Sequence, residues 1–280
     1  MRRLRGLPSA LAAALALAAC APSPPVAGPG PSAAPDDSHV PPFARWPYQR
    51  FSREAALQIA LREWRAFGQP IVLPHQELPF DNERAEGLWQ RVGEYWWLGL
   101  PLPSLEQGWT GMHDANGRVF PAGEDGNYAW SATFIDYVMR MAGAGHRFPY
   151  SPTHADYINA AKEHANGQRP DLAIRAEPPE RYAPTRGDLI CMWRGRQAVS
   201  YAELPAGRFP GHCDIVVAVR PGVLDVIGGN VDNSVSMKRI PVTADGHLAG
   251  PDGTVVDPDH PWFVVLRVEY EVNPPAAPVS

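Results

Sequence analysis

The stretch Tyr128–Val138, with the sequence YAWSATFIDYV, decides how the rest of the chain is interpreted. It predicts a loop that ends at Ser131, followed by an apolar helix over 132–142. A side chain at a helix start lies at the positive end of the helix dipole, beside backbone N–H groups that have no intrahelical partner. That position suits a nucleophile, and it equally suits an ordinary serine helix cap. From the sequence, Ser131 can be either a nucleophile or a helix cap.

Helical periodicity extends on both sides of this stretch. Ser52 is expected to cap a helix that continues to about Phe67, where a glycine stops it. A second helix is expected to start at Asp81 or Asn82 and to run through Trp96. A Pro/Gly-rich loop over 99–127 is long enough to form a wall over a cleft. A further helix is predicted over about 152–164.

The pattern changes after Pro178 to short apolar runs that are rich in valine and separated by turn residues. Strands are predicted over 187–193, 212–220, 222–228, 235–240 and 262–272. Helices therefore come first and an antiparallel meander follows, which predicts an α+β fold.

The first residues have the features of an export signal. A basic segment with three arginines precedes an Ala/Leu-rich run that is too short to span a bilayer, which predicts a signal peptide over 1–19. The run ends in Leu17-Ala18-Ala19-Cys20, which resembles the lipobox of bacterial lipoproteins. That resemblance implies lipidation of Cys20 and a membrane anchor, and Ala21 favours the outer membrane, with the domain facing the periplasm. A plain secretory signal is the alternative.

The residues after the signal divide into a tether and a domain. Residues 20–42 are rich in Pro, Ala, Gly and Ser and predict a semi-extended tether without a core. Residues 43–275 have a globular composition with no dividing linker, and they predict a single domain.

Charge argues against one class of partner. The formal charge of −5 becomes −8 once Arg2, Arg3 and Arg5 are removed with the signal. A mildly acidic chain without a basic cluster is not expected to bind nucleic acid, because such binding needs positive patches. No metal-ligand spacing and no phosphate loop is present in the sequence, so no metal or cofactor is expected. The oligomeric state stays open.

Two cysteines remain in the exported domain. Cys191 and Cys213 each lie in a predicted strand, and they can face each other if the two strands pair. An oxidising compartment then favours a disulfide, with two separately buried thiols as the alternative. Cys213 and His212 are adjacent on a strand and point to opposite faces, so neither cysteine is expected to act as a nucleophile with that histidine.

Four motifs carry a family resemblance. The motifs are Trp130-Ser131, Gly187-Asp188-Leu189-Ile190, a Gly-His-Cys-Asp-Ile-Val run over 211–216, and Gly229-Asn230. Their order along the chain resembles that of papain-like amidases of bacterial cell walls. The chain resembles those CHAP and NlpC-type folds. Across roughly 51–272 it resembles more closely a family of bacterial lipoproteins catalogued as domain of unknown function 2272.

The amidase resemblance implies roles for individual residues. It implies that Ser131 is the nucleophile, His212 the base and Asn230 the group that holds the imidazole. Asp214 follows His212 by two residues on the same strand face, where it can orient the site or pair with an arginine. Those enzymes have cysteine where this chain has Ser131, and a serine hydroxyl needs a base to remove its proton.

Each of these residues has a simpler interpretation. His212 can be an edge histidine, and Asn230 can hold a turn, because asparagine tolerates left-handed backbone. Trp130 and Trp109 lie near the predicted cleft and can stack on sugar rings, although such residues more often belong to a core.

Two functions are therefore expected. The first is a cell-envelope lipoprotein that hydrolyses peptidoglycan amide bonds through Ser131 and His212. The alternative is a catalytically inactive papain-like lipoprotein that binds peptidoglycan or an envelope partner.

Overall fold

The computed structural model describes residues 50–73, 83–101 and 103–270. The predicted signal peptide, Cys20 and the tether lie outside the described residues, as does the predicted helix start at Asp81 or Asn82. Within the described part, no helix is both long and apolar enough to cross a membrane.

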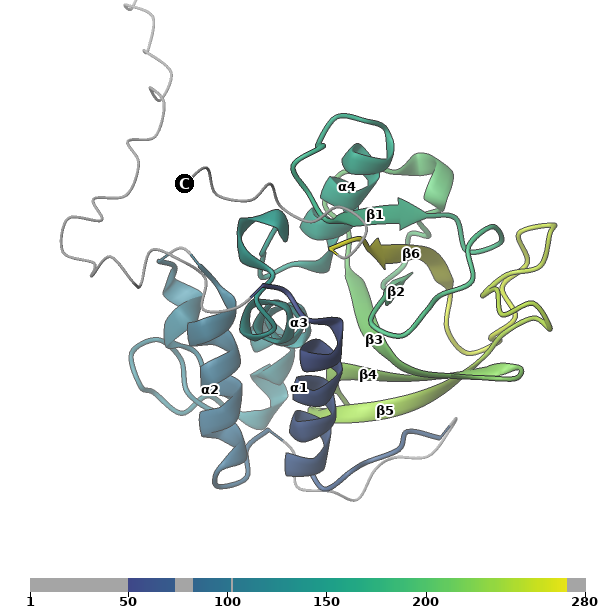
Figure 1. Ribbon diagram of the computed structural model, residues 1–280. Helices are drawn as coiled ribbons and strands as arrows, with labels where there is room; N and C mark the ends of the chain where they lie inside the picture. Colours follow the sequence, from purple (N-terminus) through teal and green to yellow (C-terminus); the bar gives the residue numbers. More distant parts are fainter. Residues whose placement is uncertain (1–49, 74–82, 102, 271–280) are drawn as a thin grey trace, which may run out of the picture. The chain divides into compact units, whose positions relative to one another are not determined.

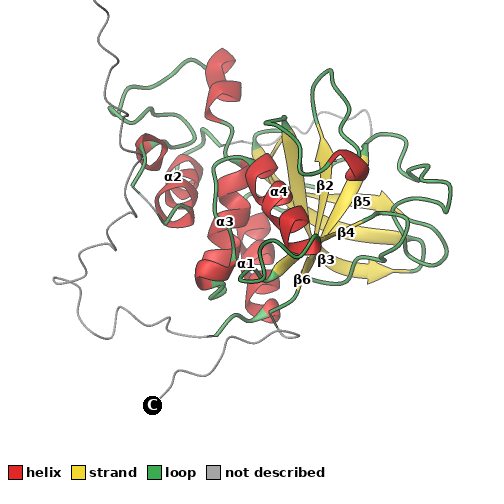
Figure 2. Ribbon diagram, turned by 90° about the horizontal axis from the view of Figure 1, so that it is seen from above, coloured by secondary structure: helices red, strands yellow, loops and turns green. Residues whose placement is uncertain are grey.

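The described residues form a layer of helices packed against a curved antiparallel sheet (Figures 1 and 2). This confirms the predicted α+β class. The α-helices are α1 (Arg53–Ala66), α2 (Leu88–Gly99), α3 (Ser131–Met141) and α4 (His154–Ala165). The strands are β1 (Ile174–Glu177), β2 (Leu189–Trp193), β3 (Gly211–Arg220), β4 (Val223–Val231), β5 (Ser234–Pro241) and β6 (Trp262–Val268).

Local sequence explains several of these boundaries. Ser52 caps α1 by accepting a hydrogen bond from Ala55 N at 3.1 Å, as predicted. The β4–β5 hairpin turns through Asp232 and Asn233, both with positive φ, at 52° and 56°. Asp and Asn tolerate this left-handed backbone, which matches the right-handed twist of the paired strands.

The strands are arranged in the order β1-β6-β2-β3-β4-β5 within the part of the chain that is described. The meander from β2 to β5 follows the prediction, but β6 returns to lie between β1 and β2. The short strand β1 was not predicted from the sequence. Pairing places Met192 opposite His212, Cys191 opposite Cys213, and Ile190 opposite Asp214.

Each face of the sheet has its own apolar core. The larger core lies between the helices and one face, with Phe134 and Ile135 of α3 packed against strand residues such as Ile215 and Ile227. The smaller core covers the other face and includes Val216. As a result, alternate residues of β3 enter different cores.

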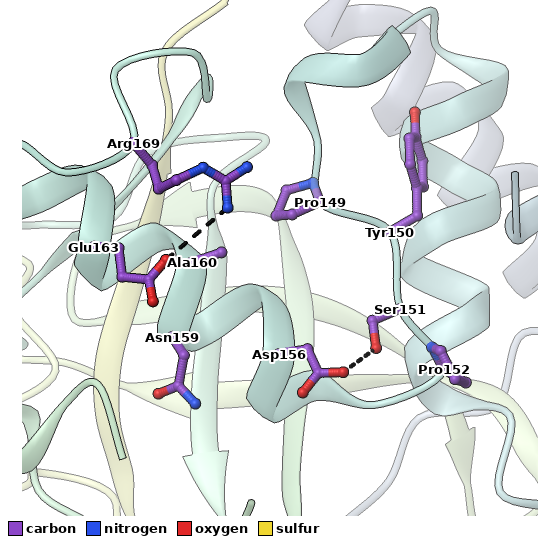
Figure 3. A pocket seen from close by; sticks show the side chains of 9 residues that line it. All are labelled: Pro149, Tyr150, Ser151, Pro152, Asp156, Asn159, Ala160, Glu163 and Arg169. Carbon is purple, nitrogen blue, oxygen red and sulfur yellow. Dashed lines mark hydrogen bonds and ion pairs between the residues drawn. The ribbon is translucent and has the colours of Figure 1, made fainter. Parts of the chain in front are cut away.

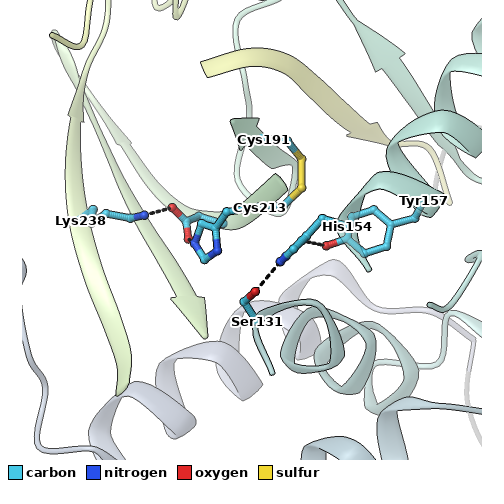
Figure 4. The surroundings of a disulfide bond; sticks show 8 residues. Ser131, His154, Tyr157, Cys191, Cys213 and Lys238 are labelled. Atoms are coloured by element: carbon cyan, nitrogen blue, oxygen red, sulfur yellow. Dashed lines mark hydrogen bonds and ion pairs between the residues drawn. A yellow bond between two sulfur atoms is a disulfide. The ribbon is translucent and has the colours of Figure 1, made fainter. Parts of the chain in front are cut away.

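Cys191 and Cys213 form a disulfide between β2 and β3, with Cα atoms 4.1 Å apart (Figure 4). This confirms the prediction of a cross-strand bond. Both side chains are fully buried in the larger core. The disulfide therefore fixes the pairing of β2 with β3, the strand on which His212 lies.

Candidate active site

Ser131 is the first residue of α3, and its hydroxyl does not cap that helix. The N-cap position belongs to Trp130, and no side chain caps it. Instead, Ser131 Oγ lies 2.7 Å from Nε2 of His154 (Figure 4). The serine is 7% exposed. The structure thus favours a polar site at Ser131 over the helix-cap interpretation.

His154 is the first residue of α4 and bridges Ser131 to a tyrosine. Its Nδ1 atom is hydrogen-bonded to the Tyr157 hydroxyl, one helical turn further on (Figure 4). Both side chains are buried. Burial, assisted by the nearby His212, lowers the pKa of His154 well below its usual value, so the ring is neutral at pH 7.

His212 lies on β3 and is held by a carboxylate. Its Nε2 is 2.8 Å from Asp214 Oδ1, and Lys238 Nζ of β5 is 2.7 Å from Asp214 Oδ2. All three side chains are buried. Burial by itself would raise the pKa of Asp214, but Lys238 and His212 outweigh it and hold that pKa below its usual range. Asp214 is therefore an anion, and the hydrogen bond requires a proton on His212 Nε2.

The other nitrogen of His212 has no hydrogen bond. Nδ1 is buried and has no partner among the described residues. Burial lowers the pKa of His212 to about 4, with Lys238 acting in the same direction and Asp214 opposing it. The ring is neutral at pH 7, and with its proton on Nε2 it presents a free acceptor at Nδ1.

The two imidazoles are neighbours. The ring centroids of His154 and His212 are 5.3 Å apart, with an angle of 58° between the ring planes. The Ser131–His154 bond joins α3 to α4, and the contact between the two rings joins α4 to β3. We call the whole group the serine–histidine cluster, which consists of Ser131, His154, Tyr157, His212, Asp214 and Lys238.

Gly228 of β4 lies directly against Asp214 and His212, and it leaves no space for a side chain of its own. A Cβ atom at this position would lie 1.9 Å from Asp214 Oδ1 and 3.0 Å from His212 Nε2. A Cβ on the next residue, Gly229, would lie 2.4 Å from the Cβ of Phe134 on α3. Any side chain at these glycines would thus displace the carboxylate–imidazole pair or the start of α3.

The structure places Asn230 in a bulge after these glycines. Its φ is 53°, and the β4–β5 register shifts between Gly228 and Val231. This left-handed backbone agrees with the simpler interpretation of Asn230 as a turn residue. The group that holds the His212 imidazole is Asp214, one of the two roles that the sequence suggested for it.

The two tryptophans have different surroundings. Trp130 is fully buried, packs against Tyr95 and Phe134, and donates its Nε1–H to Glu83. Trp109 is half-buried and forms an edge contact with Tyr128. The core interpretation therefore fits Trp130, and stacking on a sugar remains a prediction for Trp109 alone.

Sequence reasoning missed three members of the cluster. His154 and Tyr157 share one helix face at i,i+3 spacing, a pattern that also describes an ordinary buried helix face. Lys238 lies in a predicted strand, where a lysine usually points to solvent. No local signal shows that these side chains converge, because they come from α4 and β5.

Two pockets formed by described residues lie outside the cluster. One, of about 460 Å³, lies between α4 and the segment 149–152 and includes Asp156, Glu163 and Arg169 (Figure 3). A second, of about 440 Å³, includes Arg140 and His146. Neither is lined by a residue of the serine–histidine cluster. Within the described residues, no group of three or more His, Cys, Asp or Glu side chains could hold a metal ion.

Fold and site together define an α+β domain in which a buried serine is bonded to one histidine, whose ring neighbours a second. Residues 83–268 match a family described as uncharacterized proteins conserved in bacteria, DUF2272, and the chain belongs to that family. The match includes every residue of the cluster. No curated protein and no solved structure matches the chain.

Proposed function

We propose that this chain is a cell-envelope lipoprotein with a papain-like domain that hydrolyses an amide bond of peptidoglycan. Ser131 is the nucleophile, His212 the general base and Asp214 the group that orients the base. The order of the motifs along the chain supports this assignment, as does the position of Ser131 at the start of a helix.

One observation carries the proposal. His212 is neutral, is held at Nε2 by an anionic carboxylate, and has a buried, free Nδ1 in the same cluster as a serine hydroxyl. A serine becomes nucleophilic when such a base takes its proton in the transition state. Most buried polar atoms are satisfied, so a buried acceptor without a partner, in the same cluster as a serine hydroxyl, calls for an explanation.

The chemistry follows without a metal or a cofactor. The Ser131 proton passes to His212 Nδ1 while Oγ forms a bond to the amide carbon. The imidazolium returns this proton to the leaving nitrogen as the C–N bond breaks. Water then loses a proton to Nδ1, its oxygen bonds to the carbonyl carbon of the acyl-serine, and the ester C–O bond breaks as Ser131 regains its proton. Backbone N–H groups in the first turn of α3 supply donors for the oxyanion.

The first experiment compares the purified protein with a Ser131→Ala variant on isolated peptidoglycan, with soluble fragments read by mass spectrometry. Ser234→Ala is a matched control, because Ser234 is also buried and its hydroxyl has no partner among the described residues. Fragments from the wild type and the control, and none from Ser131→Ala, would establish a serine hydrolase. Their masses would identify the bond.

A Ser131→Cys variant tests the base separately. With a competent imidazole beside it, the new thiol should react with thiol-directed amidase inhibitors much faster than the same variant that also carries His212→Gln. Equal, slow labelling of both would contradict a role for His212.

Burial of the cluster favours a second candidate, a protein that binds peptidoglycan without cleaving it. Ser131 is 7% exposed and His212 is not exposed at all. Co-sedimentation with peptidoglycan by both the wild type and Ser131→Ala, without fragments from either, would support binding alone.

The proposed anchor is tested independently of activity. Cys20 precedes the described residues and is the predicted site of lipidation. Cys20→Ser should move the protein from the membrane fraction to the soluble fraction, and a variant that still sediments with outer membranes would contradict the anchor.

A further inference from the structure

We infer that His154 and Tyr157 form a positioning pair that donates a hydrogen bond to Ser131 Oγ and thereby directs the serine's own proton toward His212. This inference deepens the proposed function and rests on it. It assigns a role to the second imidazole, which the hydrolytic steps themselves do not use.

Tyr157 lies on α4, and its side chain is fully buried. Its hydroxyl contacts Nδ1 of His154, and the described residues offer it no other hydrogen-bond partner. Burial raises the pKa of Tyr157 well above its usual value, so the phenol keeps its proton. That proton needs an acceptor, because a buried unsatisfied donor is costly. Nδ1 of His154 is the acceptor at hand.

The proton position on His154 follows from this. A neutral imidazole carries one proton, and a ring that accepts at Nδ1 must carry its proton on Nε2. Nε2 lies 2.7 Å from Ser131 Oγ. His154 therefore donates to the serine and does not accept its proton.

Ser131 then needs an acceptor for its own hydroxyl proton. His212 Nδ1 is a buried acceptor without a partner, on the ring next to His154. Its Nε2 already donates to Asp214. The structure itself has no bond between Ser131 Oγ and His212 Nδ1. Once the proposed bond forms, each donor from Tyr157 to His212 meets the acceptor of the next group, and the series of hydrogen bonds ends at the Asp214–Lys238 ion pair.

Electrostatics supports the same direction of proton transfer. The series of hydrogen bonds ends at the Asp214 carboxylate, which stabilises an imidazolium at His212. His154 has no carboxylate bound to it, since its two ring nitrogens contact Tyr157 and Ser131. Of the two histidines, only His212 is bonded to a carboxylate that stabilises its protonated form.

The first test reads the tautomers directly. In the 15N-labelled full-length protein at pH 7, long-range ¹H–¹⁵N spectra distinguish Nδ1–H from Nε2–H rings, with assignments from His154→Gln and His212→Gln. We expect both rings as the neutral Nε2–H tautomer. A proton on Nδ1 of His154 would overturn the inference. Because no substrate is present, this result does not depend on whether the protein cleaves peptidoglycan.

A Tyr157→Phe variant tests the consequence. Without the phenol donor, His154 is free to carry its proton on Nδ1 and to accept from Ser131. We expect a population of Nδ1–H tautomer at His154 and a fall in kcat of about 10- to 100-fold with KM nearly unchanged. Tyr95→Phe is the matched control, because Tyr95 is also buried and its hydroxyl bonds Glu63 Oε2 outside the cluster.

The outcomes are distinct. An unchanged His154 tautomer in a folded Tyr157→Phe variant would overturn the inference, as would an unchanged kcat where the wild type is active. A tautomer shift with no cleavage by the wild type would retain the hydrogen-bond direction and reject the hydrolase proposal alone. An equal loss of kcat in Tyr95→Phe would reduce the role of Tyr157 to packing.

Discussion

Two buried carboxylates in this domain differ in what surrounds them. Glu63 on α1 accepts at Oε1 from Arg62 Nε at 2.7 Å, and at Oε2 from Arg91 at 2.8 Å and Tyr95 at 2.7 Å. Its partners are side chains from α1 and α2, and both oxygens are used. We call this group the Glu63 cluster; it joins two helices.

Asp214 is equally buried, but its partners leave a reactive group free. It binds Lys238 and the Nε2 atom of His212, whose Nδ1 atom stays without a hydrogen bond. Burial and charge alone therefore do not distinguish a candidate functional site from a structural ion-pair network. A fully satisfied network stabilises a fold, whereas a free acceptor in the same cluster as a hydroxyl is available for the proton transfer that we propose.

The largest expected effect comes from Asp214→Asn. The amide cannot balance an imidazolium, and its NH₂ group can hold His212 in the wrong tautomer. We expect the rate of peptidoglycan cleavage to fall by about 10³- to 10⁴-fold, while KM changes little. Steady-state kinetics on protein shown to be folded by circular dichroism measure this. A rate within tenfold of the wild type would remove Asp214 from the mechanism.

Gly228→Ala disturbs the same pair from β4. A Cβ 1.9 Å from Asp214 Oδ1 must displace the carboxylate, and the imidazole bonded to it moves as well. Cleavage should fall by about 100-fold, the cost of a displacement near 1 Å. Gly126→Ala is the matched control, because a Cβ there meets nothing within 4 Å. Equal activities of the two variants would show that β4 tolerates the extra atom.

Glu63→Gln tests whether the Glu63 carboxylate, unlike Asp214, acts on the stability of the fold. The Glu63 carboxylate is fully buried, but Arg62 and Arg91 are 55% and 33% exposed. Losing the charged hydrogen bonds to them should therefore cost about 1.5 to 3 kcal/mol in the free energy of unfolding. Activity per folded molecule should stay within about twofold, since Glu63 bonds to no member of the serine–histidine cluster. Urea unfolding and kinetics on one preparation measure both quantities. Lost activity with unchanged stability would reverse the roles assigned to the two carboxylates.

The sequence predicted those parts of the fold that local patterns determine. Helix α3 and strands β2 to β5 follow from apolar periodicity and turn residues, within a few residues at each end. Strand β1 was missed because its four residues give too short a pattern to recognise. The position of β6 between β1 and β2 depends on pairing between residues distant in sequence, on which periodicity carries no information.

For the site, the sequence predicted the residues that share one strand. Asp214 lies two residues from His212, so strand geometry alone places both on one face, and the structure joins them. The cross-strand disulfide was predicted on similar grounds. His154 was missed, because its contact with Ser131 depends on how α4 packs beside α3. Lys238 was missed for a related reason, since it reaches Asp214 from β5, beyond β4.

The smallest expected effect is on the pH dependence of the cleavage rate, which distinguishes the serine–histidine cluster from the Glu63 cluster. Burial and Lys238 lower the pKa of His212 to about 4, so the cleavage rate should rise with pH through about 4 and stay flat from 6 to 8. In the unfolded chain a histidine titrates near 6.5. Between pH 4 and 6.5 the unfolded state therefore binds a proton that the folded state does not, so this group lowers stability as the pH falls.

Lys238→Met tests the cause of this shift. Removing the positive charge while keeping an apolar chain of similar length should raise the pKa of His212, and the acid limb of the rate profile should move to higher pH. Glu63→Gln is the control, and it should leave that limb in place because Glu63 makes no contact with His212. A limb that stays near pH 4 in Lys238→Met would show that burial alone sets the pKa of His212. A limb that moves equally in both variants would show that the profile reports stability and not the base.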